Sequence, residues 1–376
     1  MATYEPFIWP IPTSKVVKVP KLFRTLLSLI FTAPFPSELG FAPLLDDGDE
    51  LDGKLFDKIT EEECSVVAIN AAKLGEIAFK ARDFHESTSK CPPAHAPSLK
   101  ILSTYILLLF HPSSSTHYNL RRTLLLTSPP SVLKGELYLT SLILIRSGKS
   151  SPTWSYRKDV LNLLLNHPST PVVSHPSILS TELNFVTRII KYYPKNYYAF
   201  NHRRYVLLRS PSLLELDLEV TLEELKMNNS DNSRVAHIDW LLDNVKGEVD
   251  LEGVLERLEG WGGEYPEAET IWRAVRAVGL RVLKGGGVRG EVLRRWWEDC
   301  EVIGRGEGGR KGKKHQESRL KAYLWCVSVW VRDGNGGEVE GRMGRKIRTM
   351  CLKELGRREQ VNEHLDRLKD TELMNF

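Results

Sequence analysis

One short pattern recurs along this chain at intervals that indicate a repeat architecture. The stretch "YYPKNYYAFNHRRYVLL" at 192–208 joins a Pro-Lys-Asn turn to aromatic residues and a basic cluster. Positions equivalent to Phe200 recur at 118, 154, 235 and 272, so that successive units are separated by 36, 46, 35 and 37 residues. Each interval is long enough for two helices and two turns, which predicts a stack of helical hairpins.

The units differ in how completely they keep the pattern. Three units have an aromatic residue followed three positions later by an arginine: Tyr118 with Arg121, Trp154 with Arg157, and Phe200 with Arg203. The fourth unit has Val235 and Ile238 at these positions, and the fifth keeps Trp272 but has Val275. Two units are therefore degenerate.

The segments before the turns have the apolar spacing of amphipathic helices. In "STELNFVTRII", Leu183, Val186 and Ile189 recur at helical intervals, and Ser180 or Thr181 is a candidate N-cap. The long 46-residue interval contains the polar run "NHPSTPVVSHPS", which we interpret as a longer loop. Because one hairpin cannot bury its apolar face alone, the fold class predicted is all-α, an α-solenoid of antiparallel helical hairpins with a concave side.

In three units, an acidic residue lies 18 residues before the position equivalent to Phe200. These residues are Glu136, Glu182 and Asp217. The spacing places an acid on the first helix of each hairpin, so we expect Glu136 to pair with Arg157 and Glu182 to pair with Arg203 within their own units.

The flanking regions lack the repeat. We divide the chain into an irregular extension at 1–59, an N-terminal helical cap at 60–97, the repeats at 98–280 and a C-terminal helical cap at 281–376. Thr60 and Glu63 form a candidate capping box at the start of the first helix. The basic, glycine-rich run at 304–316 is expected to be an inserted loop.

Composition excludes several classes of protein. A net charge of +4, from 52 basic and 48 acidic residues, is too balanced to indicate nucleic-acid binding, so no nucleic-acid partner is expected, although the 304–316 run leaves that alternative open. Five scattered cysteines without a C-x-x-C pair indicate neither a disulfide framework nor a zinc site. The apolar runs are too short to span a bilayer and no signal peptide is recognised, so a cytoplasmic location is expected.

The repeat resembles a known family. "ELNFVTRIIKYYPKNYYAFNHRRYVLL", together with "GKSSPTWSYRK" and "HPSSSTHYNLRR", is similar to the protein prenyltransferase α-subunit repeat, whose signature is P-K-N-Y-x-x-W-x-x-R-R. The resemblance covers about 98–280. It is strongest to the divergent α-subunit-repeat-containing proteins, the α-like partner of a geranylgeranyltransferase, with the farnesyl and type I α-subunit as the alternative.

The resemblance implies a TPR-like right-handed crescent that binds a separate β-subunit. That β-subunit would carry the catalytic zinc and bind the prenyl diphosphate, so this chain itself would bind no metal or cofactor. The implied reaction is transfer of a geranylgeranyl or farnesyl group to a C-terminal cysteine of a substrate protein, with this chain active only in the heterodimer.

The resemblance also implies candidate site residues. The diphosphate lysine is Lys195 by motif identity and Lys149 by the order of the repeats, and both stay candidates. Tyr197 and Tyr198 match family residues that face the prenyl diphosphate and the substrate. Asn196 and His202 are further candidates for substrate contact, although a turn role for Asn196 and a packed or hydrogen-bonded role for His202 are the alternatives.

The other motif residues favour structural roles. The aromatic positions are expected to pack one hairpin on the next, and the arginines are expected to form internal ion pairs. A different functional class also stays open, because helical solenoids often bind other proteins without catalysis. The degenerate fourth and fifth units keep this scaffold alternative alive.

Overall fold

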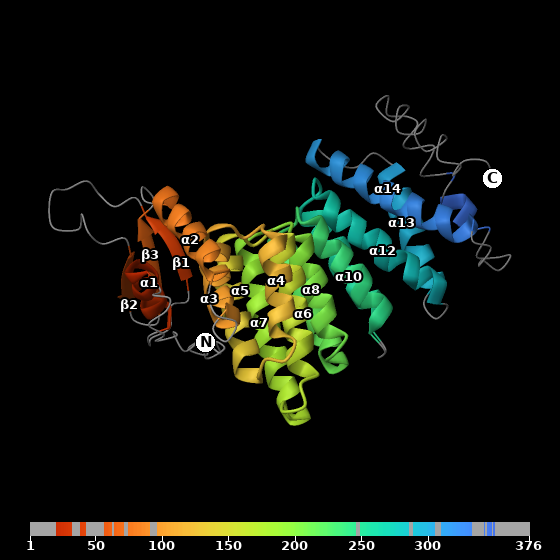
Figure 1. The fold of residues 1–376 in the computed structure, drawn as a ribbon. Coiled ribbons are helices and arrows are strands. Elements are labelled where there is room, and N and C mark those ends of the chain that lie inside the picture. Colours follow the sequence, from red (N-terminus) through yellow and green to blue (C-terminus); the bar gives the residue numbers. More distant parts are fainter. Residues whose placement is uncertain are drawn as a thin grey trace. The chain divides into compact units, whose positions relative to one another are not determined.

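The computed structural model describes most of the repeat region and parts of both flanks (Figure 1). The described residues are 20–31, 38–42, 56–61, 64–70, 74–90, 96–245, 249–285, 289–304, 310–332, 342, 344–347 and 349. They form two compact units, Met1–Ser210 and Pro211–Phe376. No described helix is long and apolar enough to cross a membrane.

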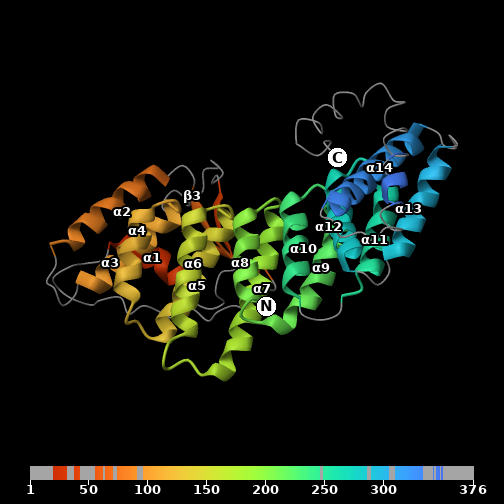
Figure 2. The same ribbon diagram turned by 90° about the vertical axis from the view of Figure 1, so that its right-hand side faces the viewer.

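The first unit contains three helical hairpins. They are α3 (Ala96–Phe110) with α4 (Ser115–Leu125), α5 (Pro130–Arg146) with α6 (Ser151–Leu165), and α7 (His175–Tyr192) with α8 (Tyr197–Leu207). The first helices α3, α5 and α7 pack in sequence, and the second helices α4, α6 and α8 form a parallel second layer (Figures 1 and 2). The predicted α-solenoid of antiparallel helical hairpins is confirmed for the repeats, and a small N-terminal sheet, described below, departs from the all-α class.

The second unit continues the same pattern. Its hairpins are α9 (Leu214–Met227) with α10 (Asn232–Asn244), and α11 (Leu251–Glu264) with α12 (Glu269–Gly285). Short 3-10 turns, Val172–Ser174 and Pro211–Leu213, precede α7 and α9. The degenerate units therefore fold as hairpins, because Val235 and Ile238 are as buried as the residues they replace.

The aromatic positions form the interior that the sequence predicts. Tyr118, Trp154, Phe200 and Trp272 are all buried. The indole N–H of Trp154 donates to the Gly148 carbonyl oxygen at 2.7 Å, which ties the helix to its own turn. Packing and turn closure together account for the choice of an aromatic residue at this position.

Helix starts follow capping chemistry, with one correction. Asn196 Oδ1 accepts from Ala199 N at 3.2 Å, and Asp231 Oδ1 accepts from Ser233 N at 2.9 Å. The predicted start of α7 at Ser180 or Thr181 is wrong, since this helix begins at His175. Pro176 in its first turn suits a helix start because proline lacks the N–H that would go unpaired there.

The N-terminal region contains a small sheet that the sequence reading did not predict. Strands β1 (Glu38–Ala42) and β2 (Phe56–Glu61) flank β3 (Cys64–Asn70), with β1 parallel and β2 antiparallel to β3. Two predictions are therefore wrong for the described residues: that 1–59 lacks regular structure, and that a helix begins at Thr60. Thr60 lies in β2 and pairs with Ser65, while Glu63 lies outside the described residues.

The sheet lies against the first end of the hairpin stack. β1 contacts α5, and α2 (Leu74–Thr88) packs along α3 (Figure 1). Val67 and Ile69 of β3 are fully buried in the same hydrophobic core as α1 (Lys21–Phe31) and α3. The sheet and α2 thus cover apolar surface of the first two hairpins.

The C-terminal boundaries also need correction. Residue 281 lies within α12, so the repeats do not end at 280. The next helices are α13 (Arg289–Gly304) and α14 (Arg310–Arg332), which pack on α12. The prediction of a loop at 304–316 is wrong for the described residues of that segment. Gly304 is the last residue of α13, and 310–316 form the start of α14. Residues 350–376, the last part of the expected C-terminal helical cap, lie outside the described residues.

Candidate functional site

The two candidate lysines lie on neighbouring turns of the first unit. Lys149 is in the turn between α5 and α6, and Lys195 is in the turn between α7 and α8. The Asn196 side-chain amide donates to the Gly148 carbonyl oxygen at 2.7 Å, and this bond joins the two turns. Both lysine side chains are exposed at the same edge of the hairpin stack.

Close contact between these turns depends on glycine. A Cβ atom at Gly148 would overlap the ring of Tyr193, whose hydroxyl donates to the Ile145 carbonyl oxygen at 2.7 Å. The preceding turn joins in the same way, since Ser150 Oγ donates to the Pro112 carbonyl oxygen at 2.9 Å. Hydrogen bonds between turns therefore create a continuous edge.

Lys195 has an uncommon backbone conformation. Its φ is 58°, in the left-handed region, where a residue with a Cβ atom is less stable than glycine. Among the described residues it is the only non-glycine residue with a positive φ. Strain of this kind concentrates at functional sites, and it singles out Lys195 within the turn.

Two exposed tyrosines stand beside Lys195. Tyr197 and Tyr198 occupy the first turn of α8, with exposed fractions of 62% and 40% and ring centroids 5.9 Å apart. Sequence reasoning missed Tyr192, which is 57% exposed just before the same turn and has the Arg188 guanidinium 5.5 Å from its ring centroid. The tyrosine pair immediately before the Pro-Lys-Asn turn was the available signal.

Asn196 and His202 occupy structural positions. Asn196 is 1% exposed and caps α8, as its alternative turn role predicted. His202 is 3% exposed, lies 5.1 Å from the Trp154 ring and donates through Nε2 to Glu182 Oε1 at 2.7 Å. Both side chains are buried, so the structure favours the alternative structural roles over the predicted contact with substrate.

The buried arginines connect successive hairpins. Arg121 of the first hairpin binds Glu136 of the second, and Arg157 of the second binds Glu182 of the third through two hydrogen bonds of 2.6 and 2.7 Å. The predicted pairing of Glu136 with Arg157 within one unit is therefore wrong. Glu182, for which Arg203 was the expected partner, accepts from Arg157 and His202.

Within its own unit, each acid instead accepts a hydrogen bond from the residue two positions after the one equivalent to Phe200. Tyr156 donates to Glu136 at 2.6 Å, His202 donates to Glu182 at 2.7 Å, and His237 donates to Asp217 at 2.9 Å. Each arginine is also anchored to the first helix of its own hairpin. Arg157, for example, donates to the Leu137 carbonyl oxygen and to Thr140 Oγ1, both at 2.7 Å.

Electrostatics around Glu182 suit a structural ion pair. Burial raises the pKa of Glu182, but the charge of Arg157 and the hydrogen bonds from His202 and Arg157 outweigh it and lower the pKa to about 2. Burial lowers the pKa of His202 despite the neighbouring carboxylate, so its ring is neutral near pH 7. The Arg157–Glu182 pair therefore joins two hairpins, and His202 holds Glu182 within its own hairpin.

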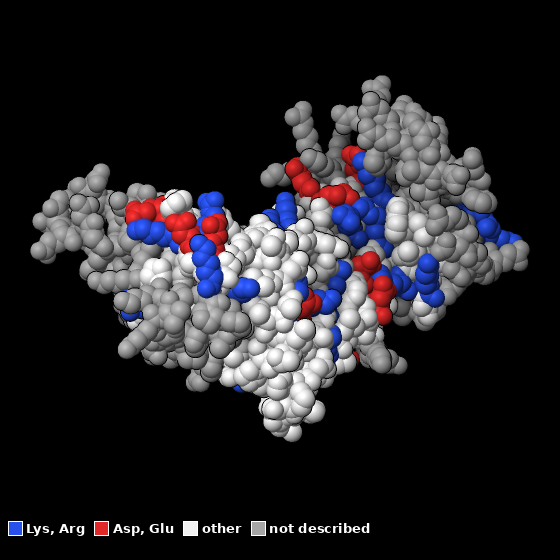
Figure 3. Space-filling view, in the orientation of Figure 1, with Lys and Arg blue, Asp and Glu red and all other residues white. Residues whose placement is uncertain are grey.

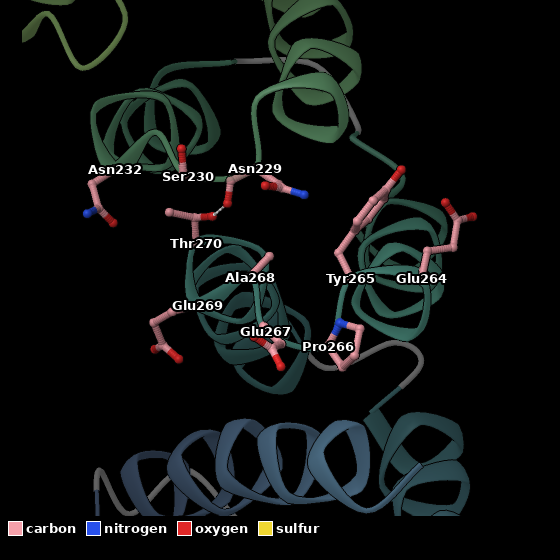
Figure 4. Close-up of a pocket in the computed structure, with 10 residues that line it drawn as sticks. All are labelled: Asn229, Ser230, Asn232, Glu264, Tyr265, Pro266, Glu267, Ala268, Glu269 and Thr270. Atoms are coloured by element: carbon pink, nitrogen blue, oxygen red, sulfur yellow. Dashed lines mark hydrogen bonds between the residues drawn. The ribbon is translucent and has the colours of Figure 1, made fainter. Parts of the chain in front are cut away.

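The turns of the second unit have a different character. The positions equivalent to Lys149 and Lys195 are Ser230 and Glu267, and they line an open pocket of about 590 Å³ (Figure 4). Thr270 Oγ1 donates to the Asn229 carbonyl oxygen across this pocket, so these turns are also joined. Its lining residues include Glu264, Glu267 and Glu269 but no lysine or arginine, so it is unsuited to a diphosphate.

Metal ligands do not gather in the described part of the chain. There, no three His, Cys, Asp or Glu side chains come close enough to hold a metal ion. Cys326 is buried and burial raises the pKa of its thiol well above the usual range, so it is poorly suited to act as a thiolate ligand.

Comparisons with known proteins support the resemblance that the repeat sequence indicated. Residues 179–210, which form most of α7, the Lys195 turn and α8, match the family described as "Protein prenyltransferase alpha subunit repeat". The chain is 30% identical over 161 residues to the human "Protein prenyltransferase alpha subunit repeat-containing protein 1". The match spans 38% of this chain and 39% of the human protein, so it covers about two fifths of that relative's length.

Proposed function

Because this chain carries the protein prenyltransferase alpha subunit repeat, we propose that it is the α-like, non-zinc subunit of a heterodimeric protein prenyltransferase. The observation that carries the proposal is the exposed edge formed by Lys149, Lys195, Tyr197 and Tyr198, where two repeat turns are hydrogen-bonded together. A β-subunit would bind this edge and supply the zinc and most of the lipid pocket. We propose a cytoplasmic location for the complex.

The reaction is alkyl transfer. The sulfur of the substrate cysteine forms a bond to C1 of the prenyl group as the bond between C1 and the diphosphate oxygen breaks. The thiol proton is lost to solvent, and the bonding electron pair leaves with the diphosphate. A partner zinc would lower the pKa of the thiol so that the thiolate is the attacking species.

This chain's contribution is electrostatic. Negative charge accumulates on the departing diphosphate, and a lysine ammonium positioned beside it stabilises that charge more in the transition state than in the ground state. Lys195 is held by a strained turn and Lys149 lies on the adjacent turn, so both are assigned this role. Geranylgeranyl is the favoured prenyl group because the sequence most resembles the divergent α-like proteins.

The test is co-expression with candidate β-subunits, followed by copurification and transfer of labelled prenyl diphosphate to protein. We expect Lys195→Ala or Lys149→Ala to reduce transfer by about 10²-fold while the heterodimer still forms. Lys134→Ala is the matched control, because Lys134 is an exposed lysine near the opposite end of α5 from the Lys149 turn. It should keep full transfer.

Two outcomes would contradict the proposal. A stable heterodimer whose transfer is unchanged by both turn substitutions would remove the lysines from the reaction. Failure to pair with any β-subunit would favour the alternative of a non-catalytic scaffold, which the loss of the motif at Val235 and Ile238 also suits.

A further inference from the structure

A groove in the second unit is independent of the turn edge. It runs between α10 and α12, which pack against each other, and Trp325 of α14 also lines it. Its volume is about 620 Å³. The groove lies on the second helices of the hairpins, whereas the pocket in Figure 4 lies at their turns.

One wall of the groove is strongly basic. Arg273, Arg276, Arg281 and Lys284 all come from α12 and line the groove. Figure 3 shows lysine and arginine side chains gathered in the part of the molecule where α12 and α14 lie. From Arg273 to Lys284 the stripe is about 17 Å long at the rise of an α-helix, so it matches about three turns of a helical partner.

The acids in the groove are already bound. Asp239 and Asp243 both accept from Arg281, at 2.7 and 2.6 Å. The Arg273 guanidinium has five N–H donors and, among the described residues, makes one hydrogen bond, to Asn232 Oδ1 at 2.7 Å; its side chain is exposed. Arg276 is also paired, since its Nη2 donates to Glu269 Oε1. Arg273 therefore retains donors for a carboxylate from outside the chain.

The floor of the groove is apolar. Val235, Ala236, Ala277, Leu280 and Trp325 line it between the charged walls. Small side chains on α10 and α12 leave space for a larger apolar side chain, and Trp325 offers an aromatic surface. An apolar floor between charged rims is the arrangement that receives one face of an amphipathic helix.

We propose that the α10–α12 groove is a docking surface for an acidic amphipathic helix of a partner protein. A carboxylate of that helix binds Arg273, the positive charges of Arg276 and Lys284 attract the rest of its acidic face, and its apolar side chains contact Ala277, Leu280 and Trp325. The apolar floor favours such a helix over a nucleic-acid backbone, which has no apolar side chains to place on it.

The probe for the test is a fluorescent helical peptide of about 12 residues, with glutamates on one face and leucine and phenylalanine beside them. Its binding to the full chain is followed by fluorescence anisotropy. Replacing Arg273 and Lys284 together by glutamate should weaken binding by at least about tenfold, because attraction at both ends of the stripe becomes repulsion. The Glu→Gln version of the peptide should bind the natural chain comparably weakly.

Matched variants distinguish the effect of losing groove contacts from the effects of changed net charge and of lost folding. Replacing Arg294 and Arg345 by glutamate changes the net charge by the same amount at exposed positions outside the groove, and should leave binding unchanged. Ala277→Phe fills the floor without changing charge and should weaken binding. Thermal melts of all variants should match the natural chain.

Three results would overturn the proposal. Equal loss of binding in the Arg294 and Arg345 variant would mean a general charge effect. Unchanged binding after Ala277→Phe would mean that the floor is not used. Tighter binding of a single-stranded oligonucleotide, lost with the same groove substitutions, would assign the basic wall to nucleic acid.

Discussion

At the scale of single residues, the candidate site contains a lysine in a backbone conformation that suits glycine. Lys195 has a φ of 58° and lies between Pro194 and the buried Asn196, which holds the turn to Gly148. The hydrogen bonds of Asn196 and the ring of Tyr193 against Gly148 maintain this turn. The chain therefore keeps a strained lysine at a position where its side chain is exposed.

Lys195→Gly separates stability from function. Glycine removes the strain of the left-handed conformation, whereas alanine keeps the Cβ atom that causes it. We therefore expect the free energy of unfolding of Lys195→Gly to exceed that of Lys195→Ala by about 1 kcal/mol. Both variants should lose prenyl transfer equally because both lack the ammonium. Urea unfolding measures the first effect, and equal stability of the two variants would show that the turn is not strained.

At the scale of elements, buried ion pairs decide how hairpins stack. Arg157 spans from its own first helix to Glu182 of the next hairpin, and Arg121 does the same with Glu136. Both partners in each pair are fully buried, so neither charge can be exposed to water without separating two hairpins. The contact therefore favours one register of stacking.

The Glu182 carboxylate should make stability depend on acidity. Its pKa is about 2 in the folded chain and near 4.5 when unfolded. The unfolded chain therefore binds more protons between these values, and the stabilisation is complete above pH 4.5 and lost as pH falls towards 2. The loss from this group is roughly 3 kcal/mol, measured by urea unfolding across this pH range.

Glu182→Gln is the control for that pH dependence. Removing the charge leaves Arg157 buried without its counterion, so we expect a loss of about 3–5 kcal/mol near pH 7 and a shallower decline below pH 4.5. Exposed Glu215→Gln on α9 should leave both properties unchanged. An unaltered acid profile in Glu182→Gln would assign the low-pH loss to other carboxylates.

At the scale of the whole molecule, each compact unit covers the apolar ends of its hairpins differently. In the first unit, the three-stranded sheet and α2 lie against α5 and α3. In the second unit, α13 and α14 pack on α12. A solenoid needs such covers because the faces of its terminal repeats have no neighbouring repeat to bury them.

The N-terminal cover should contribute measurably to stability. Ile69→Ala removes a fully buried side chain from β3, and we expect the free energy of unfolding to fall by about 2–4 kcal/mol. Phe79→Ala on α2 is the comparison, because Phe79 is 61% exposed and its loss should cost little. Similar small effects of both changes, in urea unfolding, would mean that the sheet does not stabilise the hairpins.

Sequence periodicity predicted the helical hairpins, but it did not predict the three short strands. The three strands span 5, 6 and 7 residues, too few for apolar spacing to distinguish a strand from a piece of buried helix. "CSVVAIN" did carry the β-branched residues typical of strands. Its pairing with β1 depends on residues more than twenty positions away, which local pattern cannot supply.

The sequence by itself determined the repeat, the hairpins, the buried aromatic positions and the lysine-containing turns, because these follow from local spacing and turn chemistry. Only the tertiary structure decided that Arg157 meets Glu182 and not Glu136, and that Asn196 joins two turns. The intervals of 21 residues from Glu136 to Arg157 and 25 from Arg157 to Glu182 are both compatible with adjacent helices. The choice between them rests on how two layers of helices pack, a property of the stacked hairpins that no single hairpin contains.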